Sequence, residues 1–160
     1  MNAKPTYEEL EQKVTGLSRK VNEQQAIENQ YRRLVDSTSD SLYLVDADGR
    51  YLFINHNHAR RLKMPQNDAT GLSYKDIHSP EQNAKFERKI QGVYQTGLSD
   101  SDEHHSLRDG RYFLRTFSPV RDSTHPERII AVAVVSKDIT PSREAEEALR
   151  RSEEKYRQLI

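Results

Sequence analysis

The chain has 160 residues, of which 34% are hydrophobic and 31% charged, and its 25 basic residues balance 25 acidic ones. This length allows one domain with helical extensions, and the zero net charge favours neither a nucleic-acid nor an anionic-membrane partner. The absence of cysteine excludes disulfides, thiolate metal sites, cysteine nucleophiles and covalent cysteinyl adducts. No apolar run approaches a membrane span and no signal peptide opens the chain, so we expect a cytoplasmic protein without membrane contact in these residues.

The first element in the sequence is a helix predicted over residues 6–35. Thr6 and Glu9 fit a capping box, in which each side chain accepts a hydrogen bond from the other residue's backbone N–H. Apolar residues then recur at heptad spacing: Leu10, Val14, Leu17 and Val21. The stripe favours a short dimeric coiled coil, and a helix folded back onto its own domain is the alternative.

The middle of the chain mixes strands with helices. Turn residues bound five predicted strands, at 42–45, 51–54, 100–107, 111–120 and 128–137. Two helices are predicted between the second and third strands, at 56–64 and 80–96. The last strand is apolar on both faces, so we expect it at the centre of the sheet.

A second exposed helix is predicted over residues 141–160, with Thr140 as its cap and Pro141 at its first helical position. Its end repeats the end of the first helix. Residues 28–35 and 153–160 share a glutamate, a tyrosine, an arginine and a leucine in the same register, 125 residues apart. We interpret the repeat as the start of a further module in a tandem array, and chance similarity of two charged helices is the alternative.

Five motifs in this order resemble a PAS domain: Leu44–Gly49, Phe53–Asn55, Gly71–Glu81, Phe117–Asp122 and Asp138–Thr140. The triplet Asp138-Ile139-Thr140 resembles the motif that joins a PAS core to its output helix. The resemblance implies an α+β fold with a five-stranded antiparallel sheet, helices on one face and flanking signalling helices. The domain boundaries become 1–35 for the first helix, 36–140 for the PAS sensory domain and 141–160 for a linker helix.

The resemblance also implies a function. PAS modules of bacterial sensor histidine kinases sense a ligand or state and transmit it through dimeric linker helices to adjacent PAS or kinase modules. Asp138 would tie the sheet to the exit helix, and Thr140 would cap that helix. A ligand-free dimerisation and spacer module is the alternative function.

Catalysis has little support in the sequence, which has no Gly-x-Ser-x-Gly elbow and no glycine-rich phosphate loop. We therefore predict no enzyme activity, no catalytic residue and no metal site in this chain. We expect His56 and His58 on the surface. His104 and His105 should point to opposite faces of a strand, so that one of them could face the cavity, although solvent exposure is favoured.

Cofactor identity is left open. The flavin light sensors of the superfamily need an adduct-forming cysteine, and its haem-binding oxygen sensors place a histidine ligand on the long helix. The chain has no cysteine, and residues 80–96 contain no histidine. A covalent flavin adduct and a histidine-ligated haem are therefore not expected.

Strand parity predicts a ligand cavity around Arg115. If Arg115 faces inward, a small carboxylate with an apolar part could bind its guanidinium. The predicted lining then consists of Tyr43, Phe86, Ile90, Phe113, Phe117, Val132, Val134 and Ser136. Two alternatives remain: the opposite parity, with Tyr112 and Leu114 inward, or an Arg115 paired to an internal carboxylate such as Glu103.

Overall fold

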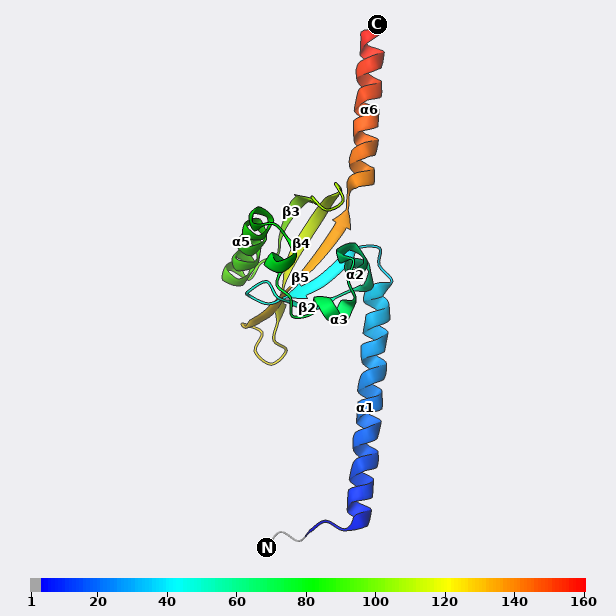
Figure 1. The fold of residues 1–160 in the computed structure, drawn as a ribbon, viewed down its shortest axis with the longest axis vertical. Helices are drawn as coiled ribbons and strands as arrows, with labels where there is room; N and C mark the ends of the chain where they lie inside the picture. Colours follow the sequence, from blue (N-terminus) through cyan, green and yellow to red (C-terminus); the bar gives the residue numbers. More distant parts are fainter. Residues whose placement is uncertain (1–3) are drawn as a thin grey trace. The chain divides into compact units, whose positions relative to one another are not determined.

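Figure 1 shows a computed structural model of the chain, which describes residues 4–160 and divides after Ser37 into two units. The first unit is helix α1, Tyr7–Asp36. Its start is the predicted capping box: the Thr6 N–H donates to Glu9 Oε2 at 2.8 Å, and the Glu9 N–H donates to Thr6 Oγ1 at 3.3 Å. The predicted boundary at residue 1 includes three residues that lie outside the described part of the chain.

The predicted heptad stripe of α1 lies on its surface. Leu10, Val14, Leu17 and Val21 are between 46% and 60% exposed. Aliphatic side chains aligned in this way form the seam of a coiled coil when a second helix covers them. The coiled-coil interpretation therefore stays a prediction that depends on a partner.

The second unit is built on a five-stranded antiparallel sheet in the order β2-β1-β5-β4-β3. The strands are β1 Ser41–Val45, β2 Tyr51–Ile54, β3 Asp100–His105, β4 Tyr112–Arg121 and β5 Ile129–Asp138. The five predicted strands are all present, and the doubly apolar β5 lies at the centre between β1 and β4. The predicted α+β fold with a five-stranded antiparallel sheet is confirmed.

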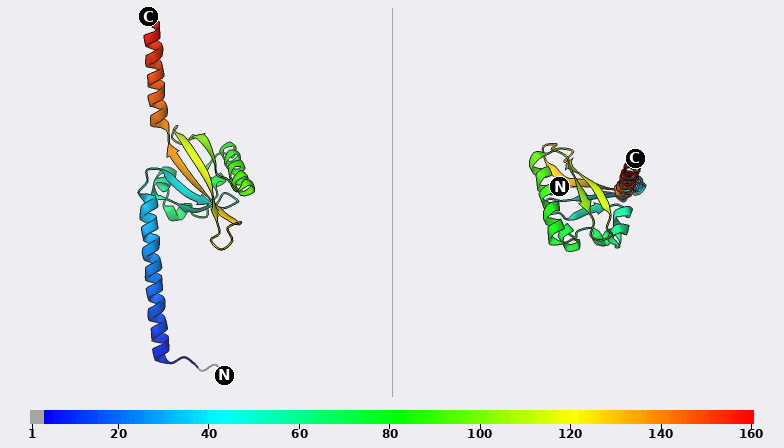
Figure 2. Two further views of the ribbon diagram at one scale, coloured as in Figure 1. Left: turned by 180° about the vertical axis from the view of Figure 1, so that it is seen from behind. Right: turned by 90° about the horizontal axis from the view of Figure 1, so that it is seen from above.

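Four helices follow β2 and precede β3 in the chain, and they form a layer on the sheet (Figures 1 and 2). They are α2 His56–Leu62, α3 Gln66–Ala69, α4 Tyr74–Ile77 and α5 Pro80–Thr96. Helix α5 begins as predicted, because the Ser79 hydroxyl accepts from the Gln82 N–H at 3.3 Å, and it ends at Gly97, whose φ of 66° few other residues adopt. The four-residue helices α3 and α4 are too short to give a helical period in the sequence.

Asn55 lies between β2 and helix α2 in the chain, and its side chain connects strand β1 to α2. It is fully buried, and its side-chain oxygen accepts from the backbone N–H groups of Leu42 and His58 at 3.0 Å each. Its amide group donates to the Asp40 carbonyl at 3.0 Å. One side chain thus fixes both the start of β1 and the N-cap of α2, which sets the orientation of α2 over the sheet.

Strand β5 leads directly into the exit helix α6, Thr140–Gln158 (Figure 2). Asp138 Oδ1 accepts from the Thr140 N–H at 2.9 Å, and Asp138 Oδ2 accepts from Arg111 Nη1 at 2.8 Å. The prediction that Thr140 caps the helix is wrong. The Thr140 hydroxyl accepts from the Tyr112 N–H of β4 at 2.9 Å, so it joins the helix start to the sheet. The residue at the N-cap position is Ile139, whose side chain cannot cap. Among the described residues, no helix is long and apolar enough to cross a membrane.

Candidate ligand-binding site

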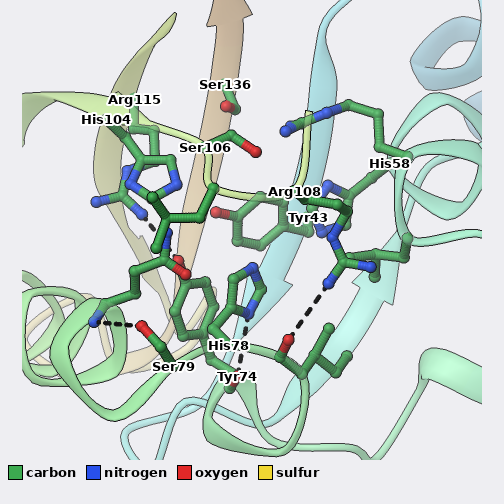
Figure 3. A pocket seen from close by; sticks show the side chains of 15 residues that line it. Tyr43, His58, Tyr74, His78, Ser79, His104, Ser106, Arg108, Arg115 and Ser136 are labelled. Carbon is green, nitrogen blue, oxygen red and sulfur yellow. Dashed lines mark hydrogen bonds between the residues drawn. The ribbon is translucent and has the colours of Figure 1, made fainter. Parts of the chain in front are cut away.

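A cavity of about 330 Å³ lies on the inner face of the sheet, where α2, α4 and the start of α5 meet β1, β3, β4 and β5 (Figure 3). Its floor includes the rings of Tyr43 and Tyr74, and the loop after β3 contributes to its wall. Fifteen residues line it: Tyr43, His58, Arg61, Leu62, Tyr74, Ile77, His78, Ser79, Gln82, His104, Ser106, Leu107, Arg108, Arg115 and Ser136. Its volume is at the lower end of the range for small-molecule sites.

Arg115 faces the cavity and is 3% exposed. The predicted inward parity of β4 is therefore confirmed, and Leu114 is on the outer face. Arg115 Nε donates to Asp102 Oδ1 at 2.9 Å and Nη2 donates to Oδ2 at 2.7 Å, while Nη1 donates to the Tyr74 hydroxyl at 3.2 Å. Burial acts to lower the pKa of Arg115, but the hydrogen bonds to Asp102 and the nearby tyrosines raise it above its ordinary value. The guanidinium is thus a permanent cation.

The internal carboxylate is Asp102 and not Glu103, which corrects the partner named from the sequence. Asp102 is directly opposite Arg115 in the β3–β4 ladder, so both side chains lie on the inner face. Glu103 is the next residue and points outward, where its Oε2 accepts from Arg143 Nη1 at 2.6 Å. Arg115 is therefore neutralised within the chain, although open space remains beside it.

Two further arginines reach the cavity, and both are less well paired. Arg61 on α2 lies with its guanidinium carbon 3.7 Å from the centre of the Phe113 ring, and its Nε is 3.8 Å from Asp109 Oδ2. That Nε is buried and has no hydrogen-bond partner, and burial lowers the pKa of Arg61. Arg108 donates from Nη2 to the Ile77 carbonyl at 3.3 Å, and it forms no ion pair with any of the described residues.

Three neutral histidines complete the wall. Burial, followed by the charge of Arg61, lowers the pKa of His58 to about 3. Burial also lowers the pKa of His78 to about 4, and burial with the Arg115 charge lowers the pKa of His104 to about 4. All three rings are uncharged at pH 7. Within residues 4–160, no cluster of histidine and acidic side chains is arranged to hold a metal ion.

The comparison with known proteins identifies the fold family. Residues 35–144 match the family described as PAS fold. The chain belongs to this family. No curated protein is significantly similar to the chain.

Several solved structures share the fold at low identity. The PAS domain of BvgS from Bordetella pertussis has 18% identity and a TM-score of 0.61, covering 79% of this chain and 96% of that one. A sensory box sensor histidine kinase from Vibrio cholerae has 17% identity and a TM-score of 0.55, covering 76% and 98%. VqmA from Vibrio cholerae has 21% identity and a TM-score of 0.60 over 71% of this chain, which spans 52% of VqmA.

In this PAS domain, three of the predicted lining residues reach the cavity: Tyr43, Arg115 and Ser136. The other six are buried but do not line it: Phe86, Ile90, Phe113, Phe117, Val132 and Val134. Parity assigns a residue to a face of the sheet, but it does not say how far along that face the open space lies. Phe113 is covered by the Arg61 guanidinium, and the remaining five belong to the apolar core.

The expected surface position of His58 is wrong, and of the two strand histidines one faces the cavity, the alternative to solvent exposure. His58 is 5% exposed, because α2 turns the face that carries His58, Ala59 and Leu62 toward the core. Its ring stacks on Tyr43 with centres 4.2 Å apart, and both ring nitrogens are buried without a hydrogen-bond partner. His104 lines the cavity, while His105 is on the outer face, stacked on Tyr112.

Sequence reasoning missed most of the polar wall of the PAS cavity. Arg61 and Leu62 follow His58 at helical spacings of three and four, a pattern that could have placed all three on one face of α2. Arg108 lies in a turn, where periodicity gives no direction. The site that results is rich in hydrogen-bond donors and positive charge.

Proposed function

We propose that this PAS domain is a signal-relay module of a larger bacterial signalling protein, a sensor histidine kinase, and that the occupancy of its cavity sets the attachment of α6. One observation carries the proposal: the cavity and the first turn of α6 share the β3–β4 hairpin. The fold similarity to a sensor histidine kinase of Vibrio cholerae and to BvgS supports this setting. A solved structure of VqmA, of the same fold, is described as bound to DPO.

Strand β3 contacts the cavity with one face and the exit helix with the other. Asp102 and His104 point inward, toward Arg115 and the cavity. Glu103, between them, binds Arg143 in the first turn of α6. A displacement of β3 that accommodates a ligand would therefore move the Glu103 carboxylate that holds the helix. An exposed ion pair of this kind is worth at most about 1 kcal/mol, so a small displacement can change its occupancy.

The turn after β3 provides a second connection. Ser106, Leu107 and Arg108 line the cavity, and Arg111 at the end of the same turn donates to Asp138 at 2.8 Å. Asp138 in turn accepts from the N–H of Thr140. Hydrogen bonding and Arg111 hold the pKa of the Asp138 carboxyl below its usual value despite partial burial, which keeps it a strong acceptor. Ligand contact at Arg108 would thus bias the predicted Asp138–Ile139–Thr140 junction.

The assembly that we propose is a homodimer. The exposed stripes of α1 (Leu10, Val14, Leu17, Val21) and of α6 (Leu149, Tyr156, Leu159) would each pair with a second copy. In this arrangement residues 1–35 and 141–160 link the PAS domain at 36–140 to neighbouring PAS or kinase modules on the cytoplasmic side. Neither pairing involves nucleic acid.

The relay is tested by a substitution that weakens the attachment of α6 and lies outside the cavity lining. Glu103→Gln removes the charge that holds Arg143, and we expect amide hydrogen exchange over residues 141–150 to become about two- to fivefold faster, because a surface pair of this strength is lost. Glu127→Gln, in the exposed turn between β4 and β5, is the matched control. Unchanged exchange over 141–150 in Glu103→Gln would remove β3 from the relay.

One observation favours a second function, the ligand-free spacer. Asp102 already neutralises Arg115, so the deepest cation of the cavity needs no ligand. Native mass spectrometry of the purified protein separates the two functions, because it reports bound small molecules and the oligomeric state together. A dimer that takes up no small molecule under any loading condition would favour the spacer.

A further inference from the structure

We propose that the cavity binds a small dianion whose two anionic groups are separated by a short carbon chain, one group near Arg115 and the other near Arg108. The proposal rests on the function proposed above and specifies what the cavity senses. It differs from the carboxylate with an apolar part that the sequence suggested, because the apolar lining predicted for that part is in the core.

The charge of the lining selects an anion. Three of the fifteen lining residues are arginines and none is acidic. The two nearby carboxylates, Asp102 and Asp109, are not among the lining residues. Asp102 is paired with Arg115, and Asp109 Oδ2 is 3.8 Å from Arg61 Nε. Three arginines against two carboxylates leave an excess of positive charge. Anions are favoured next to such groups because charge-assisted hydrogen bonds are about twice as strong as neutral ones.

The donors that remain free are numerous. A guanidinium has five N–H groups, and Arg115 uses three of them in its bonds to Asp102 and Tyr74. Arg108 uses one, on the Ile77 carbonyl. The Tyr74 hydroxyl accepts from Arg115, so its own proton is available for donation. A ligand that offers several acceptor oxygens would satisfy these groups, and a ligand with a mainly apolar surface would leave them unpaired.

The placement of the cations calls for two anionic groups. Figure 3 shows Arg115 and His104 on one side of the cavity and Arg108 and His58 on the other, with Tyr43 and His78 between them. A single carboxylate at Arg115 would leave Arg108 without a charged partner. Two carboxylates joined by a short chain can reach both arginines. The three apolar lining residues, Leu62, Ile77 and Leu107, suit a connecting chain of few carbons.

The probe pair for this proposal is succinate and butyrate, which have the same number of carbons but differ by one carboxylate. Isothermal titration at pH 7 should show succinate binding about tenfold or more tightly than butyrate, since a charge-assisted contact is added. Inorganic phosphate, whose charges are on one centre, should bind more weakly than succinate. Equal affinity for succinate and butyrate, tighter binding of phosphate, or no binding of succinate would each overturn the proposal.

Arg108→Met tests the role of the second cation. Arg108 is on an exposed turn and outside the core, so the variant should keep the melting temperature of the parent and lose about tenfold in succinate affinity. Arg128→Met, another exposed arginine of a turn, should bind succinate like the parent. Unchanged affinity in Arg108→Met would overturn the two-site geometry. Failure of the relay is a separate outcome, in which succinate binds as expected and exchange over residues 141–150 does not respond.

Discussion

The interior of the PAS domain has two ends that differ in chemistry although the same sheet and helix layer enclose both. At one end, Phe86 and Ile90 of α5 pack against Phe117 and Val132 of the sheet, and all four are fully buried. At the other end the sheet faces a cavity walled by arginines, tyrosines and neutral histidines. Helix α5 and β4 contribute to both ends, so the difference arises from side chains and not from the backbone.

The contrast separates the part of the domain that provides stability from the part that we propose binds a ligand. The apolar end gains free energy from every buried side chain, at about 25 cal/mol per Å². The polar end keeps groups that reduce stability unless they are satisfied, and the buried His58 ring has no hydrogen-bond partner at either nitrogen. Polar groups retained at such a cost are expected at functional positions.

The largest effect is expected at the apolar end. Phe86→Ala removes a fully buried ring that stacks on Tyr74 with centres 3.8 Å apart, and it should cost about 3–5 kcal/mol of unfolding free energy. Urea denaturation monitored by circular dichroism measures it. Leu98→Ala, at an exposed position, should cost little. A cost below about 1 kcal/mol for Phe86→Ala would mean that this end does not provide the stability.

The next effect concerns the buried ion pair between Arg115 and Asp102. Asp102→Asn leaves the Arg115 guanidinium buried without its charged partner, and about 3 kcal/mol should be lost. Adding Arg115→Met to Asp102→Asn removes the stranded charge and should restore part of that loss. A double variant that is less stable than Asp102→Asn would show that the pair is not the main constraint on these residues.

The pH dependence of stability should identify the polar end. The pKa of His58 is about 3 in the folded chain, far below its ordinary value of about 6.5, so the unfolded chain binds more protons between these values. Stability is therefore complete above about pH 6.5 and decreases as the pH falls toward 3. For His58 alone the loss between pH 7 and pH 5 should be about 2 kcal/mol.

Denaturation at several pH values measures this slope. The charges of Arg61 and Arg108 act on His58 in the same direction as burial, so they contribute to this slope. His58→Phe keeps a ring on Tyr43 and should reduce the slope, while His78 and His104, whose pKa values are also lowered, still contribute to it. His125→Phe, in an exposed turn, should leave the slope unchanged. Equal slopes in the two variants would place the acid sensitivity elsewhere.

The smallest effect is expected at the junction. Thr140→Val removes the hydroxyl that accepts from the Tyr112 N–H and should cost about 1 kcal/mol. The loss should appear as faster hydrogen exchange at the start of α6, with the core unchanged. Thr116→Val, exposed on the outer face of β4, is the matched control. Global unfolding in Thr140→Val would make this residue part of the core's stability and not of the relay.

Local chemistry explains which parts of the fold could be predicted from the sequence. The turn at Gly49, the start of α5 at Ser79 and the central position of β5 depend on neighbouring residues or on a short apolar run, and all three are present. The Arg115–Asp102 pair depends on the register between β3 and β4. A shift of one residue would have placed Glu103 inside, and the sequence does not fix that register.

The site was less predictable than the fold for the same reason. His58 and Arg61 reach the cavity only because α2 is held over the sheet by Asn55, a tertiary arrangement. Arg108 reaches it from a turn, through a hydrogen bond to Ile77 of another element. Each of these positions depends on contacts between elements that are far apart in the sequence, and residue periodicity does not encode such contacts.

The central claim is that the polar end of the domain senses and that α6 responds. Hydrogen exchange over residues 141–150, measured with and without saturating succinate, tests it most directly. We predict altered exchange at saturating succinate in the parent protein and in Arg128→Met. At a succinate concentration near the dissociation constant of the parent, the alteration in Arg108→Met should be much smaller than in the parent, because its affinity is about tenfold lower. Succinate that protects the cavity residues while exchange over 141–150 stays the same would contradict the claim.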